Sequence, residues 1–192
     1  MIEQKPEAAV DSTGMEASVR SAHYARRLRD GNRRYRHSKH PKLTLVCHTG
    51  SHLIVSALTT LGPSYDAPLL EPAMLKADWT FPVTIDRVLA DSGYDAEPNH
   101  RLIRQGLGIR SSVIALNRRG TRRWPPQPYR RQMARRFHRR KYRQRAQAES
   151  VISRFKRRLG AALRGRSDDA RERENNIKVF THDLMILAGS ST

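Results

Sequence analysis

The sequence has few of the features that mark secreted or membrane proteins. Cys47 is its single cysteine, so neither an internal disulfide nor a cysteine-based zinc cluster can form. No apolar run reaches the roughly 18–20 residues of a membrane span, and the first residues lack the basic-then-apolar pattern of a signal peptide. We therefore expect a cytoplasmic protein without a membrane partner, in which Cys47 is buried in a strand.

Acidic residues are scarce relative to basic ones. The 192 residues include 37 Lys and Arg but only 18 Asp and Glu, which gives a formal net charge of +19. Such a field attracts polyanions, so nucleic acid is the leading partner. Ribosomal proteins, histone-like proteins and nucleases share this charge, so it indicates a partner and not a reaction. The length fits one domain, and we predict a single domain over residues 1–192.

The eight histidines are not spaced as zinc ligands. No HExxH or comparable pattern is present, and most of the histidines lie in basic segments. We expect surface or structural roles for His23, His37, His40, His48, His52, His100, His138 and His182.

Short apolar runs predict five strands with helices between them. The strands are expected at 8–10, 43–47, 53–58, 88–90 and 112–116, and the helices at 69–77 and 97–107. The second and third strands flank a turn at 48–51 and should form a β-hairpin. The order β, ββ, α, β, α, β, followed by helices, is that of the ribonuclease H-like fold. We therefore predict an α/β domain with a mixed five-stranded sheet flanked by helices.

Basic segments lie outside these elements. Residues 17–42 are dense in Arg, Lys, His and Tyr and predict a loop, for which DNA contact is favoured over a merely solvated role. Residues 117–131 form a Pro- and Arg-rich connector that should not be regular helix. Its Trp124 is more readily explained by packing than by stacking on an unpaired base. Helices are expected at about 132–163 and 171–188.

Two carboxylates follow apolar runs directly. In the predicted fold the first and fourth strands are neighbours, so Asp11 and Asp91 should meet, and a helix after the fifth strand can bring Glu149 to them. Taken alone, each aspartate could equally be a turn or cap residue. Asp95 is a rival for Asp91, but we expect it to cap the helix that begins near Glu97.

The predicted helix around Glu149 carries a spaced polar quartet. Tyr142, Arg145, Glu149 and Lys156 follow the pattern Tyr-x2-Arg-x3-Glu-x6-Lys. At about 100° per residue these four side chains fall within an arc of roughly 60°. The adjacent arc is apolar and suits packing; it holds Ala148, Ile152, Phe155, Leu159 and Leu163. Arg145 and Glu149 could also form a plain surface pair, but the matching Tyr and Lys favour a functional site.

Three converging carboxylates suit hard metal ions. About three negative charges on oxygen ligands match two Mg²⁺ or Mn²⁺ ions, which can promote an in-line phosphoryl transfer. Glu149 would complete the metal site, and Arg145 would brace that carboxylate or a phosphate. Tyr142 and Lys156 would contact the DNA backbone.

The quartet, together with Asp11-Ser12-Thr13 and the segment 90–94, resembles the DDE transposases of prokaryotic insertion sequences. The resemblance extends from Val10 to about Leu187 and includes the segments 147–160 and 181–185. That family cuts at transposon ends and joins the freed 3′-hydroxyl to target DNA without a covalent protein–DNA intermediate.

The resemblance implies a ribonuclease H-like catalytic domain with Asp11, Asp91 and Glu149 as catalytic and metal-binding residues. It also implies double-stranded DNA as the partner, both as transposon ends and as target, a homodimer on paired ends, and a location at the nucleoid.

Two departures from the family pattern leave alternatives open. Only ten residues precede Asp11, whereas full-length relatives carry a further N-terminal region, so an N-terminal truncation is expected. Residues 117–140 can hold only a connector, where some relatives insert a β domain. The alternatives are a non-catalytic DNA-binding remnant of a truncated transposase and a stand-alone ribonuclease H-like nuclease.

Overall fold

A five-stranded mixed sheet forms the centre of the molecule. The structure is a computed structural model and describes residues 6–17, 39–80, 85–118, 120 and 123–189. The strands are β1 (Glu7–Gly14), β3 (His40–His48), β4 (Ile54–Gly62), β5 (Arg87–Ala90) and β6 (Ser111–Ile114), in the spatial order β4-β3-β1-β5-β6. The pairs β1–β3 and β3–β4 are antiparallel, and β1–β5 and β5–β6 are parallel. The predicted α/β, ribonuclease H-like arrangement is confirmed.

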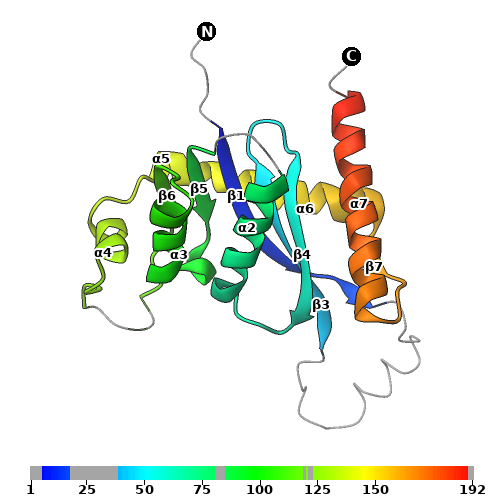
Figure 1. Cartoon of the computed structure of the whole chain (residues 1–192), viewed down its shortest axis with the longest axis horizontal. Helices are drawn as coiled ribbons and strands as arrows, with labels where there is room; N and C mark the ends of the chain where they lie inside the picture. The colour runs from blue at the N-terminus through cyan, green and yellow to red at the C-terminus, as the bar shows by residue number, and fades with distance from the viewer. Residues whose placement is uncertain (1–5, 18–38, 81–84, 119, 121–122, 190–192) are drawn as a thin grey trace.

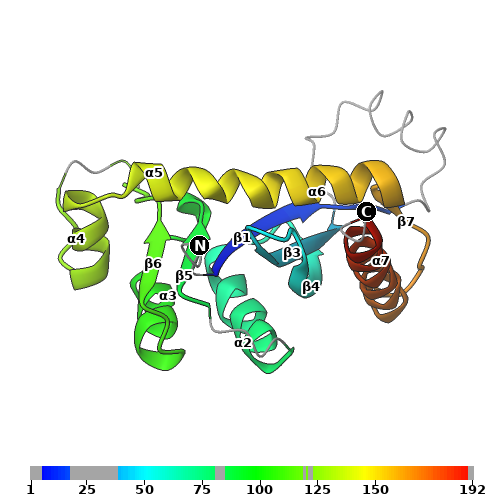
Figure 2. The same cartoon turned by 90° about the horizontal axis from the view of Figure 1, so that it is seen from above.

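Helices cover both faces of this sheet. They are η1 (Ala67–Leu69), α2 (Leu70–Thr80), η2 (Ser92–Tyr94), α3 (Glu97–Arg101), the π-helix η3 (Leu102–Gly106), α4 (Pro128–Arg135), α5 (Arg139–Tyr142), η4 (Arg143–Arg145), α6 (Ala146–Leu159) and α7 (Asp168–Gly189). A small second sheet pairs β2 (Glu16–Ala17) with β7 (Ala162–Leu163). Figure 1 shows α2 and α3 in front of the sheet, and Figure 2 shows α5 and α6 running along its opposite face.

The side chains of β1 point alternately into two hydrophobic cores, one on each face of the sheet. Ala8 and Val10 face the core under α2 and α3, whereas Ala9 faces the core under α6. Because successive strand side chains point to opposite faces, Asp11 falls on the same face as Ala9 and Ser12 on the other. Cys47 is fully buried in β3, as predicted.

The long helix predicted at about 132–163 is wrong. The chain forms α4, then breaks at Arg136, and becomes helical again only at Arg139. The break lets Phe137 pack on the Tyr142 ring, with 4.9 Å between the two ring centroids. The helix ends at Leu159, where the following Gly160 has φ of 83°, a conformation that glycine adopts without strain.

Two of the predicted basic loops are shorter than expected. Helix α4 begins at Pro128, inside the connector 117–131, because the fixed φ of proline suits the first position of a helix. In the predicted loop 17–42, Ala17 belongs to β2 and residues 40–42 to β3, where buried Lys42 pairs with Asp66 at 2.6 Å. Residues 18–38 lie outside the described residues.

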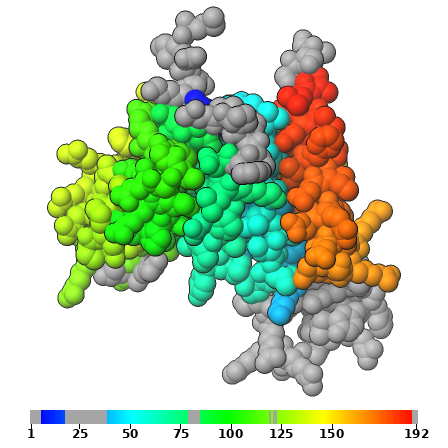
Figure 3. Space-filling model, in the orientation of Figure 1, coloured from blue at the N-terminus to red at the C-terminus, as the bar shows by residue number. Residues whose placement is uncertain are grey.

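Helix α7, predicted at 171–188, buries polar side chains and exposes large apolar ones. Polar Asn175 and His182 are buried against the rest of the molecule. The large apolar side chains that are exposed on it are Ile177, Phe180, Leu184, Met185 and Leu187. Figure 3 shows α7 along one edge of the molecule. None of the described helices combines the length and the apolar character needed to cross a membrane.

Candidate active site

The two aspartates lie next to each other at one end of the parallel strand pair. The β1–β5 register runs from Glu7 opposite Arg87 to Val10 opposite Ala90, so Asp11 and Asp91 are the next residues on each side. Strand β5 ends there, as predicted. Strand β1 does not end but continues to Gly14, because β3 still pairs with it, Asp11 opposite Leu45. The expected strand end at Asp11 is therefore wrong, although the expected proximity is present.

Asp11 lies in a partly buried position within reach of the charges of two other carboxylates and of Arg145. Its Oδ1 accepts a hydrogen bond from the Ser12 N–H at 2.9 Å. Burial raises the pKa of Asp11 from 3.8 to about 6, and the charges of Asp91 and Glu149 add to the rise, while the Ser12 N–H and Arg145 oppose it. Asp91 and Glu149 are thus both close enough to Asp11 to act on its carboxylate electrostatically.

A tight turn fixes the Asp91 carboxylate. Asp91 precedes η2, and its Oδ1 accepts a hydrogen bond from the Gly93 N–H at 2.7 Å. A Cβ on Gly93 would lie 2.8 Å from Asp66 Oδ2 and 2.9 Å from Asp91 Oδ1. A side chain at position 93 would therefore displace one or both of these carboxylates. Asp66, which is held by Lys42, was missed in the sequence because it only precedes a predicted helix.

Arg145 links the helical residues of the quartet. Its guanidinium binds Glu149 Oε1 at 2.6 Å and lies 5.5 Å from the centre of the Tyr142 ring. Burial alone would lower the pKa of Arg145. The hydrogen bond to Glu149 and the nearby Tyr142, Glu149 and Asp11 outweigh burial, so this pKa lies above its ordinary value. The side chain of Glu149 is 55% exposed, so this carboxylate stands at the open side of the site.

Lys156 connects α6 to the end of β1. Its ammonium donates to Thr13 Oγ1 at 2.6 Å and to the carbonyl of Gly14 at 2.7 Å. The four residues of the quartet lie along one run of helical residues formed by α5, η4 and α6 (Figure 2). Among the described residues, two of the three ammonium hydrogens are used in these hydrogen bonds.

A partly buried hydrogen-bond chain links Ser12 of β1 to Thr44 and Tyr94. The Ser12 hydroxyl is 2.5 Å from the Tyr94 hydroxyl and 2.7 Å from the Thr44 hydroxyl. Burial raises the pKa of Tyr94 strongly, so the ring keeps its proton. This chain fixes the residue next to Asp11, and no sequence pattern indicated it.

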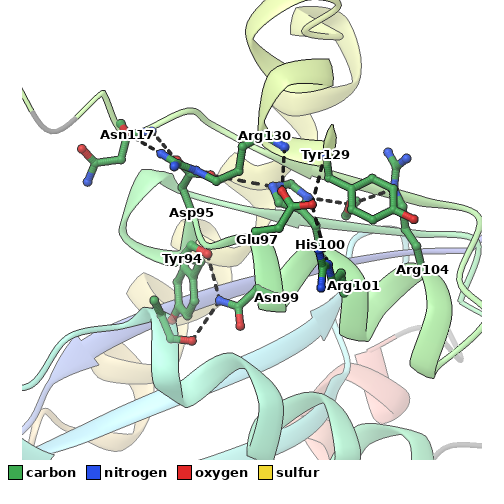
Figure 4. Close-up of polar contacts among 12 residues, drawn as sticks. Tyr94, Asp95, Glu97, Asn99, His100, Arg101, Arg104, Asn117, Tyr129 and Arg130 are labelled. Atoms are coloured by element: carbon green, nitrogen blue, oxygen red, sulfur yellow. Dashed lines mark hydrogen bonds and ion pairs between the residues drawn. The ribbon is translucent and has the colours of Figure 1, made fainter. Parts of the chain in front are cut away.

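Asp95 does not cap the helix after it, contrary to the prediction. The cap position is Ala96, and Asp95 is instead buried, binding Arg130 at 2.8 Å and the Asn117 N–H at 2.8 Å (Figure 4). Burial opposes ionisation of Asp95, but the hydrogen bonds from His100, Arg130 and the Asn117 N–H outweigh it and hold its pKa below the ordinary value. The reason for the error is Arg130, which is 35 residues away in sequence.

The described carboxylates are near one another but not gathered into a closed metal site. In the described part of the chain, no three His, Cys, Asp or Glu side chains are close enough to hold a metal ion together. Glu149 is bound to Arg145 instead of turning toward the aspartates. The donor set is nevertheless all carboxylate, which suits hard divalent cations, and the mutual repulsion at Asp11 is what such a cation would relieve.

Trp124 does not pack into the molecule as expected. Its ring is 55% exposed, and the guanidinium of Arg135 lies 5.8 Å from the ring centre.

Comparison with known proteins agrees with the fold described above. The family model described as a transposase DDE domain matches residues 3–184, which is nearly the whole chain. None of the curated proteins compared with the chain matches it.

Proposed function

Because this chain belongs to the family of transposase DDE domains, we propose that it catalyses DNA transposition by phosphodiester hydrolysis and strand transfer at Asp11, Asp91 and Glu149. The observation that carries the proposal is the β1–β5 register, which brings Asp11 and Asp91 side by side. The pKa of Asp11, raised to about 6 by burial and by Asp91 and Glu149, supports a shared anionic site.

The cofactor of the family is a divalent metal ion, and the three carboxylates are the ligands that we propose for two Mg²⁺ or Mn²⁺ ions. Bound there, the ions would supply activation of the attacking oxygen and stabilisation of the leaving one. Cation binding would compete with the ion pair between Arg145 and Glu149, whose distance is 2.6 Å. Until a cation binds, the positive charge of Arg145 neutralises Glu149 and offsets the repulsion that Glu149 exerts on Asp11.

The remaining members of the quartet orient the DNA. We propose that Lys156 uses its third hydrogen on a backbone phosphate while its other two hold Thr13 and Gly14. Tyr142 lies beside Arg145 and can donate its hydroxyl to a neighbouring phosphate oxygen. Double-stranded DNA, as transposon end and as target, is the proposed substrate, and two copies of the chain would act on paired ends.

The test is cleavage of supercoiled plasmid in Mg²⁺ or Mn²⁺. We expect the parent to cut and both Asp91→Asn and Glu149→Gln to lose cleavage, because each removes one charged ligand. Glu172→Gln, the same chemical change at an exposed position on α7, is the matched control and should cut like the parent. Full activity in either site variant would contradict the proposal, and an inactive parent that binds DNA tightly would indicate a non-catalytic remnant.

A further inference from the structure

The stretch of sequence that leads to Glu149 is strongly basic. Residues 98–148 contain 16 Lys and Arg and no Asp or Glu. Most of the net charge of +19 is therefore concentrated in the stretch that ends one residue before Glu149.

The two acidic residues that precede this stretch hold the inner face of α4. Glu97 accepts hydrogen bonds from the backbone N–H groups of Tyr129 at 3.3 Å and Arg130 at 3.1 Å, which are free donors at the start of a helix. Asp95 binds the Arg130 side chain, and Arg104 lies 4.9 Å from the centre of the Tyr129 ring (Figure 4). These contacts hold α4 against the rest of the domain.

The outer face of α4 is hollowed and lined by arginine. A hollow of about 410 Å³ is formed by Pro126, Pro128, Arg131, Gln132, Arg135 and Arg136. All three arginines are exposed, and no acidic side chain of the described residues lines the hollow.

The connector restrains two of these arginines. Arg135 stacks near the exposed Trp124 ring, and Arg131 Nε donates to the carbonyl of Pro125 at 3.2 Å. Side chains that are already restrained lose less conformational freedom when they bind a ligand. The hollow is therefore partly preorganised for an anion.

The chemistry and position of the hollow fit a nucleic-acid backbone. Guanidinium groups match phosphate oxygens with paired hydrogen bonds, and three of them in a row match a chain of phosphates. From Arg139 to Glu149 the helical run covers about 15 Å, which is less than the roughly 34 Å of one B-DNA turn. Figure 2 shows α4 just beyond the outer end of this run.

We propose that the hollow formed by Arg131, Arg135 and Arg136 beside Trp124 binds the phosphate backbone of the DNA duplex that flanks the scissile bond. The site is separate from the carboxylates and from the Tyr142, Arg145 and Lys156 contacts. The inference rests on the proposed function for the identity of the substrate, but its binding step requires no catalysis.

The test measures duplex binding in EDTA by fluorescence anisotropy over a range of salt concentrations. The variant carries Arg131→Gln, Arg135→Gln and Arg136→Gln, and the matched control carries Arg164→Gln, Arg166→Gln and Arg173→Gln, three exposed arginines at the other end of the molecule. We expect the hollow variant to bind at least tenfold more weakly at 0.1 M salt. The slope of log affinity against log salt concentration should also become less steep by about 2–3, since each lost phosphate contact removes about 0.9. The control should stay within about threefold of the parent.

Three results would overturn the proposal. They are parent-like binding by the hollow variant, an equal loss in both variants, and a loss confined to single-stranded DNA of the same length, which would assign the surface to base stacking on Trp124. The plasmid assay separates this inference from the proposed function. If the parent does not cut plasmid but the hollow variant loses duplex binding, only the proposed catalysis is refuted. If the parent cuts plasmid and the hollow variant binds duplex as tightly as the parent, only the proposed role of the hollow is refuted.

Discussion

At the scale of single residues, the candidate site depends on how closely carboxylates approach one another. The negative charges of Asp91 and Glu149 both raise the pKa of Asp11. The carboxylates of Asp66 and Asp91 approach each other beside Gly93. Arg145 and Lys42 supply the positive charge that offsets this crowding.

Gly93→Ala should slow plasmid cleavage and destabilise the fold only modestly. The added Cβ would meet Asp66 Oδ2 at 2.8 Å and Asp91 Oδ1 at 2.9 Å, and both are ends of side chains that can shift. We expect at least a tenfold slower plasmid cleavage with a stability loss of about 1–2 kcal/mol, at the lower end of overpacking costs. Gly189→Ala, which meets nothing within 4 Å, is the control. Parent-like cleavage by Gly93→Ala would argue against a role for Asp91.

Tyr94→Phe should destabilise the fold modestly. The change removes the buried hydroxyl that lies 2.5 Å from the Ser12 hydroxyl, and a lost hydrogen bond of this kind costs about 0.5–1.5 kcal/mol. Urea unfolding measures the loss, and Tyr65→Phe, at a side chain that is 88% exposed, should show none. An unchanged unfolding midpoint for Tyr94→Phe would show that this hydrogen bond does not stabilise β1.

At the scale of elements, the strands and the helices around the sheet could be predicted because their apolar runs are local. The positions of Asp11 and Asp91 followed from that order. The break at Arg136 could not be predicted, because it depends on Phe137 packing on Tyr142. The same limit applies to Asp95, whose partner Arg130 belongs to a distant helix. The ion pair of Arg145 with Glu149, by contrast, could be predicted, because residues four apart on a helix are neighbours.

The contact between Asp95 and α4 predicts a pH-dependent stability. Because the folded pKa of Asp95 is below its ordinary value, its contribution is fully present above about pH 4 and is lost as the pH falls further through the folded pKa. Asp95→Asn should therefore lower stability at pH 7 by about 3–5 kcal/mol, since the mostly buried Arg130 loses its carboxylate partner, and the difference from the parent should shrink in acid.

Urea unfolding at several pH values measures this effect. Asp168→Asn, at an exposed residue that pairs with Arg171 at 3.1 Å, is the control and should change stability little. A difference between Asp95→Asn and the parent that stays constant from pH 7 to pH 3 would contradict the account of this ion pair.

At the scale of the whole molecule, the net charge of +19 predicts steeply salt-dependent DNA binding. With 6–10 phosphate contacts, affinity should fall about 10³–10⁵-fold between 50 and 200 mM salt. Anisotropy with a labelled duplex measures the slope. Affinity that hardly changes with salt would contradict binding through phosphates.

The central claim is that Asp11, Asp91 and Glu149 together bind divalent metal, and iron-directed cleavage of the protein backbone tests it most directly. Fe²⁺, hydrogen peroxide and ascorbate are added in the presence of duplex DNA. Bound Fe²⁺ reduces the peroxide to hydroxyl radicals that cut the chain near the ion, and ascorbate reduces the resulting Fe³⁺ back to Fe²⁺. The account predicts cuts close to residues 11, 91 and 149 that excess Mg²⁺ suppresses and that Asp91→Asn weakens at all three places. Cuts at other positions, or cuts at these positions that Mg²⁺ does not suppress, would contradict it.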